Sequence, residues 1–231
     1  MNSPARFPSP RRTAASAFTL LELMVAIGIM AIIMTLVVPA VKGINGSRGL
    51  TRGINDVSGI LELARAEAMA TRSYVYVGFA NTTNSDGNSE LRIGAVISID
   101  GSSSTAASNL RAVSKLSKIA NVRMTDYNSL PQVVKSAADT SLQTSADYVI
   151  NFTPQTSYLQ GKFNDRSLDT CPTLAIAPQG EVLNLYSPTV FFRTTSSVGL
   201  VPTHGTNPVT TDGAIVSYYG GTGQLRVTRP L

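Results

Sequence analysis

The hydrophobic pattern of the chain is dominated by one long apolar run near the N-terminus. Between Leu20 and Val41 the only charged residue is Glu22. As a helix with a rise of 1.5 Å per residue, this run is about 33 Å long. A hydrocarbon core is about 30 Å thick, so the run predicts a membrane-spanning helix. A carboxylate inside such a helix is costly to bury, and we therefore expect Glu22 to have a specific partner.

The chain changes character after Pro39. Proline removes a backbone hydrogen bond from a helix, and the glycines at 43, 46, 49 and 53 each cost a helix about 1 kcal/mol relative to alanine. The sequence therefore predicts a helix kink at Pro39 and a helix that is kinked or partly melted from there to Gly53.

A second helical pattern follows this glycine-containing segment. Its apolar residues are spaced alternately four and three apart, which places them on one face of a helix. We expect this face to pack on a sheet. The residues are Leu50, Ile54, Val57, Leu61, Ala64 and Ala68.

The remainder alternates short apolar segments with clusters of Gly, Asn, Ser and Pro, which is typical of strands joined by turns. Together with the long helix, this pattern predicts an α+β fold. The polar segment 125–146 is predicted to be a long loop or a short helix. Strands are predicted at 73–79, 91–99, 112–119, 147–152, 173–177, 181–186, 189–193, 213–219 and 223–228.

Composition favours an extracytoplasmic β-rich part, and the charge of the chain is concentrated near its N-terminus. Only 14% of the residues are charged and Trp is absent, which favours a loop-rich extracytoplasmic domain over a charged cytosolic enzyme. The net charge of +5 comes largely from three arginines in residues 1–17, a segment without acids. Without them 16 basic residues stand against 14 acidic ones, a net charge of +2. Such a balance is weak support for nucleic-acid binding by the rest of the chain.

Candidate catalytic and metal-binding residues are few. Cys171 and His204 are each the single residue of their type, and together they cannot fill a tetrahedral zinc shell. No nucleophile elbow accompanies His204. The segment Asn84–Asn88 resembles a calcium loop but lacks a closing Glu, so a hairpin loop is the favoured interpretation. We therefore expect no enzyme, no cofactor and no metal site.

The residues around the start of the apolar run resemble a known signal. Ala17-Phe18-Thr19-Leu20-Leu21-Glu22-Leu23-Met24-Val25, followed by an apolar helix, resembles the class III signal of type IV prepilins and of the pseudopilins of type II secretion systems. The resemblance implies that a prepilin peptidase cuts between Ala17 and Phe18 and that Phe18 is then N-methylated. It makes Glu22 the fifth mature residue, where its carboxylate can pair with the α-ammonium of a neighbouring Phe18. Pro39 falls where the family often has a helix-kinking proline.

One residue departs from the family pattern. The position before the cut is usually Gly, and here it is Ala17, which leaves the efficiency of cleavage open. The alternative is an uncleaved, ordinary membrane anchor whose basic N-terminus is held in the cytoplasm. Both interpretations place residues 1–17 in the cytoplasm and the C-terminal domain outside.

The resemblance implies a pilin-like α+β organisation, in which a long N-terminal helix packs on an antiparallel sheet. Residues 1–17 are the basic prepilin leader, and 18–43 the transmembrane or filament-core helix. Residues 44–72 are the amphipathic half of that helix, and 73–231 the extracytoplasmic β-rich domain.

Two further segments resemble particular subgroups. Leu63–Arg72, followed by the apolar strand Tyr74–Phe79, is similar to the GspH/FimT-type minor pseudopilins. Ala95–Gly101, followed by a Lys- and Leu-rich strand, resembles the Verru_Chthon cassette protein D group of pilin-like proteins.

The expected function is that of a non-enzymatic minor subunit of a type IV pilus or a type II secretion pseudopilus. Its expected partners are prepilin peptidase, other pilin or pseudopilin subunits and the bacterial inner membrane. A membrane-anchored DNA-binding module for DNA uptake is the alternative, with Arg226 and Arg229 as candidate phosphate contacts.

Overall fold

The structure, a computed structural model, describes residues 19–138, 158–169, 171–183 and 195–230. It does not describe the side chains of residues 36–48 and Tyr158. The chain forms two compact units, Met1–Val41 and Lys42–Leu231. Each unit is treated by itself below.

The first element is α1 (Leu20–Thr71), a single uninterrupted helix. The expectation that it is partly melted between Pro39 and Gly53 was therefore wrong. In the second unit the reason is close packing. A Cβ on Gly49 would lie 3.2 Å from the carbonyl oxygen of Ala120, and one on Gly53 would lie 3.4 Å from Val122. The glycines let the helix approach the sheet, and this contact compensates for their low helix propensity.

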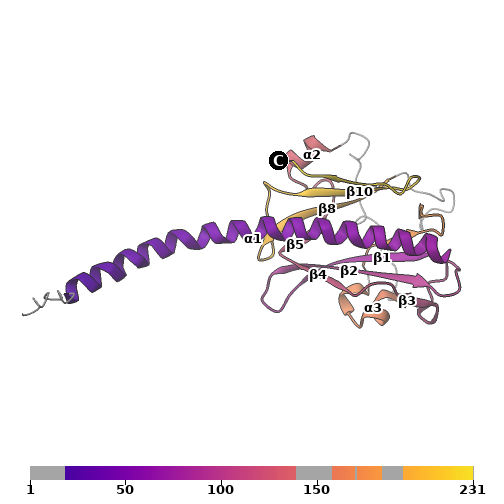
Figure 1. Ribbon diagram of the computed structural model, residues 1–231, viewed down its shortest axis with the longest axis horizontal. Helices are drawn as coiled ribbons and strands as arrows, with labels where there is room; N and C mark the ends of the chain where they lie inside the picture. The colour runs from indigo at the N-terminus through magenta and orange to yellow at the C-terminus, as the bar shows by residue number, and fades with distance from the viewer. Residues whose placement is uncertain (1–18, 139–157, 170, 184–194, 231) are drawn as a thin grey trace, which may run out of the picture. The chain divides into compact units, whose positions relative to one another are not determined.

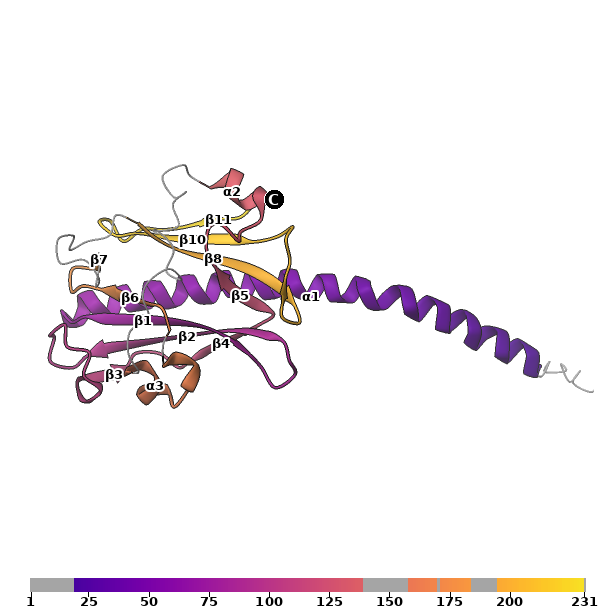
Figure 2. The same cartoon turned by 180° about the vertical axis from the view of Figure 1, so that it is seen from behind.

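The second unit contains two antiparallel sheets (Figures 1 and 2). The first has the order β3-β2-β1-β6-β7, with β4 also paired to β2, and the second has the order β11-β10-β8-β5, with β9 paired to β8. The strands are β1 (Val75–Thr83), β2 (Ser89–Ser98), β3 (Leu110–Ala112), β4 (Ser117–Ala120), β5 (Val122–Thr125), β6 (Thr173–Ile176), β7 (Val182–Leu183), β8 (Thr195–His204), β9 (Asn207–Pro208), β10 (Ala214–Tyr219) and β11 (Leu225–Thr228).

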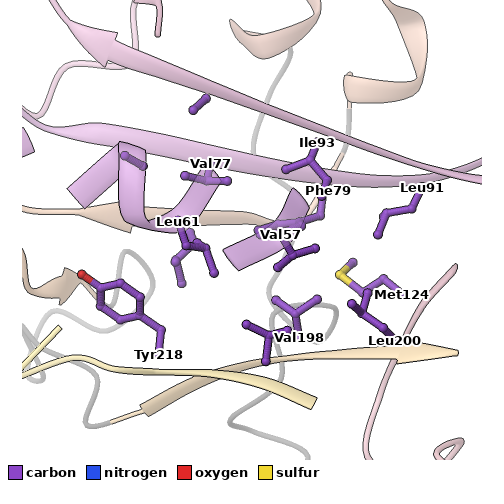
Figure 3. Close-up of a cluster of buried hydrophobic side chains, with 14 of the residues drawn as sticks. Val57, Leu61, Val77, Phe79, Leu91, Ile93, Met124, Val198, Leu200 and Tyr218 are labelled. Carbon is purple, nitrogen blue, oxygen red and sulfur yellow. The ribbon is translucent and has the colours of Figure 1, made fainter. Parts of the chain in front are cut away.

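The second half of α1 lies between the two sheets and completes the core. All six residues of its predicted apolar stripe are buried, from Leu50 to Ala68, so that prediction is confirmed. Figure 3 shows Val57 and Leu61 between the side chains of both sheets. The first sheet contributes Val77, Phe79, Leu91 and Ile93, and the second contributes Met124, Val198, Leu200 and Tyr218. The helix thus packs on two sheets where the sequence predicted one.

Short helices cover the outer faces of the sheets. The outer face of the first sheet carries α3 (Tyr158–Phe163), with the 3-10 turns η1 (Ala107–Asn109) and η5 (Arg166–Leu168) nearby. Gly78 and Gly94 stand opposite each other in β1 and β2. A Cβ on Gly78 would overlap Leu159, and one on Gly94 would overlap the ring of Phe163. The absence of a side chain at these two paired glycines therefore allows α3 to pack directly on the sheet.

The strand predictions differ from the structure in several places, and the short strands β5 and β9 were not expected either. The single strand expected at 112–119 is two strands, β3 and β4, which pair with different parts of β2. The long strand β8 was not expected, because its sequence is rich in Ser and Thr and lacks apolar alternation. The segment 125–146 contains the short helix α2 (Gln132–Ala137), which packs on the second sheet through Val134. The strands expected at 147–152 and 189–193 lie outside the described residues.

Candidate functional site

The first turn of α1 begins with a reciprocal pair of residues, Thr19 and Glu22. The Glu22 backbone N–H donates to the Thr19 hydroxyl at 3.2 Å. In return, the Thr19 backbone N–H and hydroxyl each lie 3.4 Å from one Glu22 carboxylate oxygen. This is a capping box, which satisfies N–H groups that have no partner within the helix. The negative charge also lies at the positive end of the helix dipole, where it is stabilising.

The sequence contained a signal for this cap. A Thr followed three residues later by Glu, directly before an apolar run, is the signature of a capping box. Sequence reasoning considered Glu22 only as a partner for another subunit, and it missed Thr19 altogether.

The apolar side chains that follow the cap are exposed. The large ones from Leu20 to Met34 have between 53% and 77% of their surface accessible. They are Leu20, Leu21, Leu23, Met24, Val25, Ile27, Ile29, Met30, Ile32, Ile33 and Met34. A contiguous apolar surface of this kind marks a site that contacts protein or membrane.

A separate finding concerns membrane spans. Within the part of the chain that the structure describes, no helix is both long enough and apolar enough to cross a membrane.

Of the four residues predicted for processing and assembly, only Glu22 has a described side chain. Ala17 and Phe18 lie outside the described residues, so cleavage between them and methylation of Phe18 stay predictions. The side chain of Pro39 is not described either, and its kink stays a prediction. Glu22 contacts Thr19 of its own chain, and its pairing with Phe18 of a neighbouring subunit also stays a prediction.

The surroundings of Cys171 and His204 also bear on the roles considered for them. Cys171 is buried, and burial raises the pKa of its thiol to about 11, although hydrogen bonding to Thr173 lowers it in part. A thiol with a raised pKa is a poor nucleophile. His204 is exposed at the end of β8.

The suspected calcium loop is the turn of the β1–β2 hairpin. Its Asn84 side chain accepts hydrogen bonds from the backbone N–H groups of Asp86 and Asn88 at 3.0 and 2.9 Å. The hairpin interpretation is confirmed. The described residues contain no group of three or more His, Cys, Asp or Glu side chains that could hold a metal ion.

The two arginines considered for DNA differ in their surroundings. Arg229 donates to the Asp212 carboxylate at 3.0 Å and to the Thr51 hydroxyl at 2.9 Å. It therefore joins the C-terminal segment to α1. Arg226 lies on β11 and is exposed. The structure thus gives Arg229 a role within the domain.

Comparisons with known proteins bear on the N-terminal segment. Residues 12–38 match the family described as the prokaryotic N-terminal methylation motif. No curated protein and no solved structure matches the chain. The matched range covers the predicted cleavage position, the capping box and most of the apolar run. The chain therefore carries a prokaryotic N-terminal methylation motif, as proteins of the type IV prepilin and pseudopilin type do.

Proposed function

We propose that this protein is a minor subunit of a type IV pilus or a type II secretion pseudopilus. In this proposal prepilin peptidase processes the chain between Ala17 and Phe18. The protein is held before assembly as a single-pass protein of the bacterial inner membrane, with its β-rich domain outside the cytoplasm. The observation that carries the proposal is the methylation motif at residues 12–38. The exposed apolar side chains from Leu20 to Met34 support it, because they form a surface that needs a lipid or protein partner.

The proposed mechanism is assembly through the N-terminal helix. Packed helices bury the exposed apolar side chains, which is the main driving force for association. The Glu22 carboxylate, placed at the first turn of α1 by its cap, pairs with the α-ammonium of Phe18 in a neighbouring subunit. Each group would be costly to bury alone in a core of low dielectric constant, and pairing offsets that cost. No catalytic chemistry is part of this mechanism.

Processing is tested by the N-terminus of the mature protein. The full chain is produced with and without prepilin peptidase, and its N-terminal peptide is identified by mass spectrometry. We expect a peptide that starts at Phe18 and carries an added methyl group only when the peptidase is present. A chain that keeps residues 1–17 with active peptidase would contradict the proposal and favour the ordinary anchor. Ala17→Gly is the matched variant, and it should be cleaved at least as fast.

Assembly is tested by separating the charge of Glu22 from its role in the cap. Gln at this position can also complete a capping box, so Glu22→Gln removes the charge and keeps the cap. Thr19→Val does the reverse. If Glu22 pairs with an α-ammonium, Glu22→Gln should lose filament incorporation as fully as Glu22→Ala, with membrane insertion unchanged, while Thr19→Val should assemble. Filament incorporation of Glu22→Gln at the wild-type level would refute the charge pairing.

DNA uptake is the alternative function, and its candidate contacts are Arg226 and Arg229. A gel-shift titration of the full chain in detergent over a salt series tests it. Phosphate contacts should make the logarithm of the binding constant fall linearly with the logarithm of salt concentration. Retarded DNA with that dependence, lost in Arg226→Gln, would favour the DNA-binding role.

A further inference from the structure

A small polar cavity of about 190 Å³ lies in the second unit, where parts of both sheets meet. Four segments line it: the end of β1, the start of β2, β5, and the turn between β8 and β9. Cavities that enclose drug-sized ligands measure about 300–1,000 Å³, so this one fits only a small chemical group. The lining residues are Asn81, Thr82, Thr83, Ser89, Arg123 and Thr206, and we call this the Arg123 cavity.

Hydrogen bonds fix the walls of the Arg123 cavity. The Asn81 side chain donates to the carbonyl oxygen of Met124 and accepts from its backbone N–H, both at 2.8 Å. It thereby joins β1 to β5 across the two sheets. The backbone N–H of Ser89 donates to the carbonyl oxygen of Gly205 at 2.8 Å, which ties the β8–β9 turn to β2. The cavity is therefore formed before any ligand enters.

Arg123 is the one charged residue in the lining. Its side chain is half-buried, and within the described chain it makes no hydrogen bond or ion pair. The half-buried arginines elsewhere behave differently, since Arg92 binds two carboxylates and Arg65 binds two carbonyl oxygens. None of the Arg123 guanidinium nitrogens is among the buried side-chain atoms of the described residues that lack a partner, so the guanidinium is accessible to a ligand.

Two carboxylates lie close to the lining residues, one through the strand pairing and one through the sequence, and both already have partners. Glu90 stands opposite Thr82 in the β1–β2 ladder, and its carboxylate binds Arg92 at 2.7 Å. Asp126 follows β5, and it accepts from the backbone N–H of Ser129 at 2.9 Å. Neither is positioned by these contacts to neutralise Arg123, so the charge of the guanidinium remains available to a ligand.

We propose that the Arg123 cavity binds a phosphate group. A guanidinium presents several N–H donors in a plane and matches two oxygens of a phosphate at once. The hydroxyls of Thr82, Thr83, Ser89 and Thr206 are further donors, and a phosphate has enough oxygens to accept from them together with the arginine. Inorganic phosphate and the headgroup of a phospholipid are the two sources of this group. The proposal is independent of pilus assembly.

The test is calorimetric titration of inorganic phosphate into the full chain, purified in a neutral detergent in phosphate-free buffer at constant ionic strength. We expect saturable binding with a Kd near 1 mM, a value typical of a weak ion site. Loss of a hydrogen-bonded charge should weaken binding about tenfold or more in Arg123→Gln. The matched control is Lys118→Gln, which removes the same charge from an exposed position on β4 and should change Kd by less than about twofold.

A second variant protects the test against misfolding. Thr206→Val removes one hydroxyl from an exposed turn, and it should weaken binding about threefold, as expected for one neutral hydrogen bond. Equal affinities of the wild type and Arg123→Gln would overturn the proposal. Failure of the wild type to bind at about 50 mM phosphate, far above the expected Kd, would overturn it as well.

A competition experiment distinguishes inorganic phosphate from the phospholipid headgroup as the ligand. The phosphate titration is repeated in micelles that contain phosphatidylglycerol or, at the same negative charge, oleate, which has no phosphate. Weaker binding of phosphate with phosphatidylglycerol alone identifies the lipid headgroup as a ligand of the cavity. Equal affinity in both micelles identifies free phosphate.

Discussion

At the scale of single residues, Arg65 joins three parts of the second unit. Its guanidinium donates to the carbonyl oxygens of Thr222 and Gly223 in the turn between β10 and β11, at 2.7 and 3.1 Å. Gly223 has a φ of +66° and lies directly against the arginine, so a Cβ there would overlap the guanidinium. Gly180, after β6, packs against the same side chain. Arg65 therefore links α1 to the backbone of two turns, the β10–β11 turn and the turn that contains Gly180.

This contact predicts a large effect of a single methyl group. Gly223→Ala should destabilise the protein by about 1–3 kcal/mol, because it combines a left-handed backbone with an overlap. Gly221→Ala is the matched control in the same turn, where an added Cβ meets nothing within 4 Å. It should be close to neutral. Chemical denaturation of both variants measures the difference, and equal effects would contradict the role given to Arg65.

Three buried acidic groups set the response to alkaline pH. Burial raises the pKa of Cys171 to about 11 and those of Tyr76 and Tyr218 to about 12. The two phenols also donate hydrogen bonds, Tyr76 to Ser103 at 2.8 Å and Tyr218 to Gly180 at 2.7 Å. All three groups are therefore held in their neutral forms in the folded protein.

The sign of the pH dependence follows from linkage. The unfolded chain releases these protons at lower pH than the folded one, so it binds fewer protons and stability falls as pH rises. The contribution is complete below about pH 8, where thiols and phenols are neutral in the unfolded chain as well. It is lost progressively as the pH rises from there to about 12. Melting temperatures measured over this range should show the fall, and Tyr218→Phe should make it shallower. A melting temperature that stays constant to the end of the range would be inconsistent with these shifts.

At the scale of elements, an ion pair network fixes the segment after α3 to the first sheet. Arg92 on β2 binds Glu90 and Asp165, each at 2.7 Å. Burial alone would raise the pKa of Asp165, but hydrogen bonds from Ser167 and the charge of Arg92 lower it overall. The carboxylate also caps the turn η5 through the backbone N–H of Ser167 at 3.0 Å.

Removing the arginine from this network should be costly. Arg92→Met leaves two mostly buried carboxylates without their cation, and we expect a loss of about 2–4 kcal/mol, near the lower end for a broken buried pair. Arg111→Met is the control, because its pair with Glu67 at 3.5 Å is largely exposed and should contribute less than about 1 kcal/mol. Denaturant titrations compare the two. Similar losses would show that the network around Arg92 is not specifically stabilising.

Elements were predictable where local periodicity matched burial. The apolar stripe of α1 was recognised from its spacing, and β10 from its run of apolar residues. The strand β8 was missed because its buried Ser197 is satisfied by Ser217 of β10, at 3.2 Å across the ladder. Such a polar pair is compatible with burial only once both strands are in register. The sequence of either strand alone does not show it.

The same rule applies to sites: they can be predicted when their residues are close together in the sequence. Glu22 could be identified because it is the one charged residue within a continuous apolar run, although its capping partner Thr19 was missed. The Arg123 cavity could not, since its residues come from four separate segments that meet only in the folded domain. Arg123 itself lies in a segment for which the sequence predicted no strand.

At the scale of the whole molecule, the two compact units have different kinds of surface. The core of the second unit starts at Leu50 and includes no residue before it, among the residues that the structure describes. The large apolar side chains of the first unit are exposed instead. Burial of apolar area is the main source of folding stability, so the second unit contains what it needs to fold.

A chain that starts at Lys42 should therefore fold on its own. We expect it to be monomeric without detergent and to unfold cooperatively, within about 4 °C of the melting temperature of the full chain in detergent, a shift that corresponds to about 1 kcal/mol or less. Circular dichroism and size-exclusion chromatography measure both properties. A non-cooperative transition would mean that residues before Lys42 contribute to the core.

The capping box at Thr19 and Glu22 has a consequence for the order of maturation. Both of its residues follow the predicted cut after Ala17, so removal of the leader would leave every hydrogen bond of the cap in the product. The helix would begin at the same residue before and after proteolysis. The peptidase would then cut close to an already formed helix, and the new amino group would belong to the residue directly before Thr19. Maturation would change the charge at this end of the protein without refolding it.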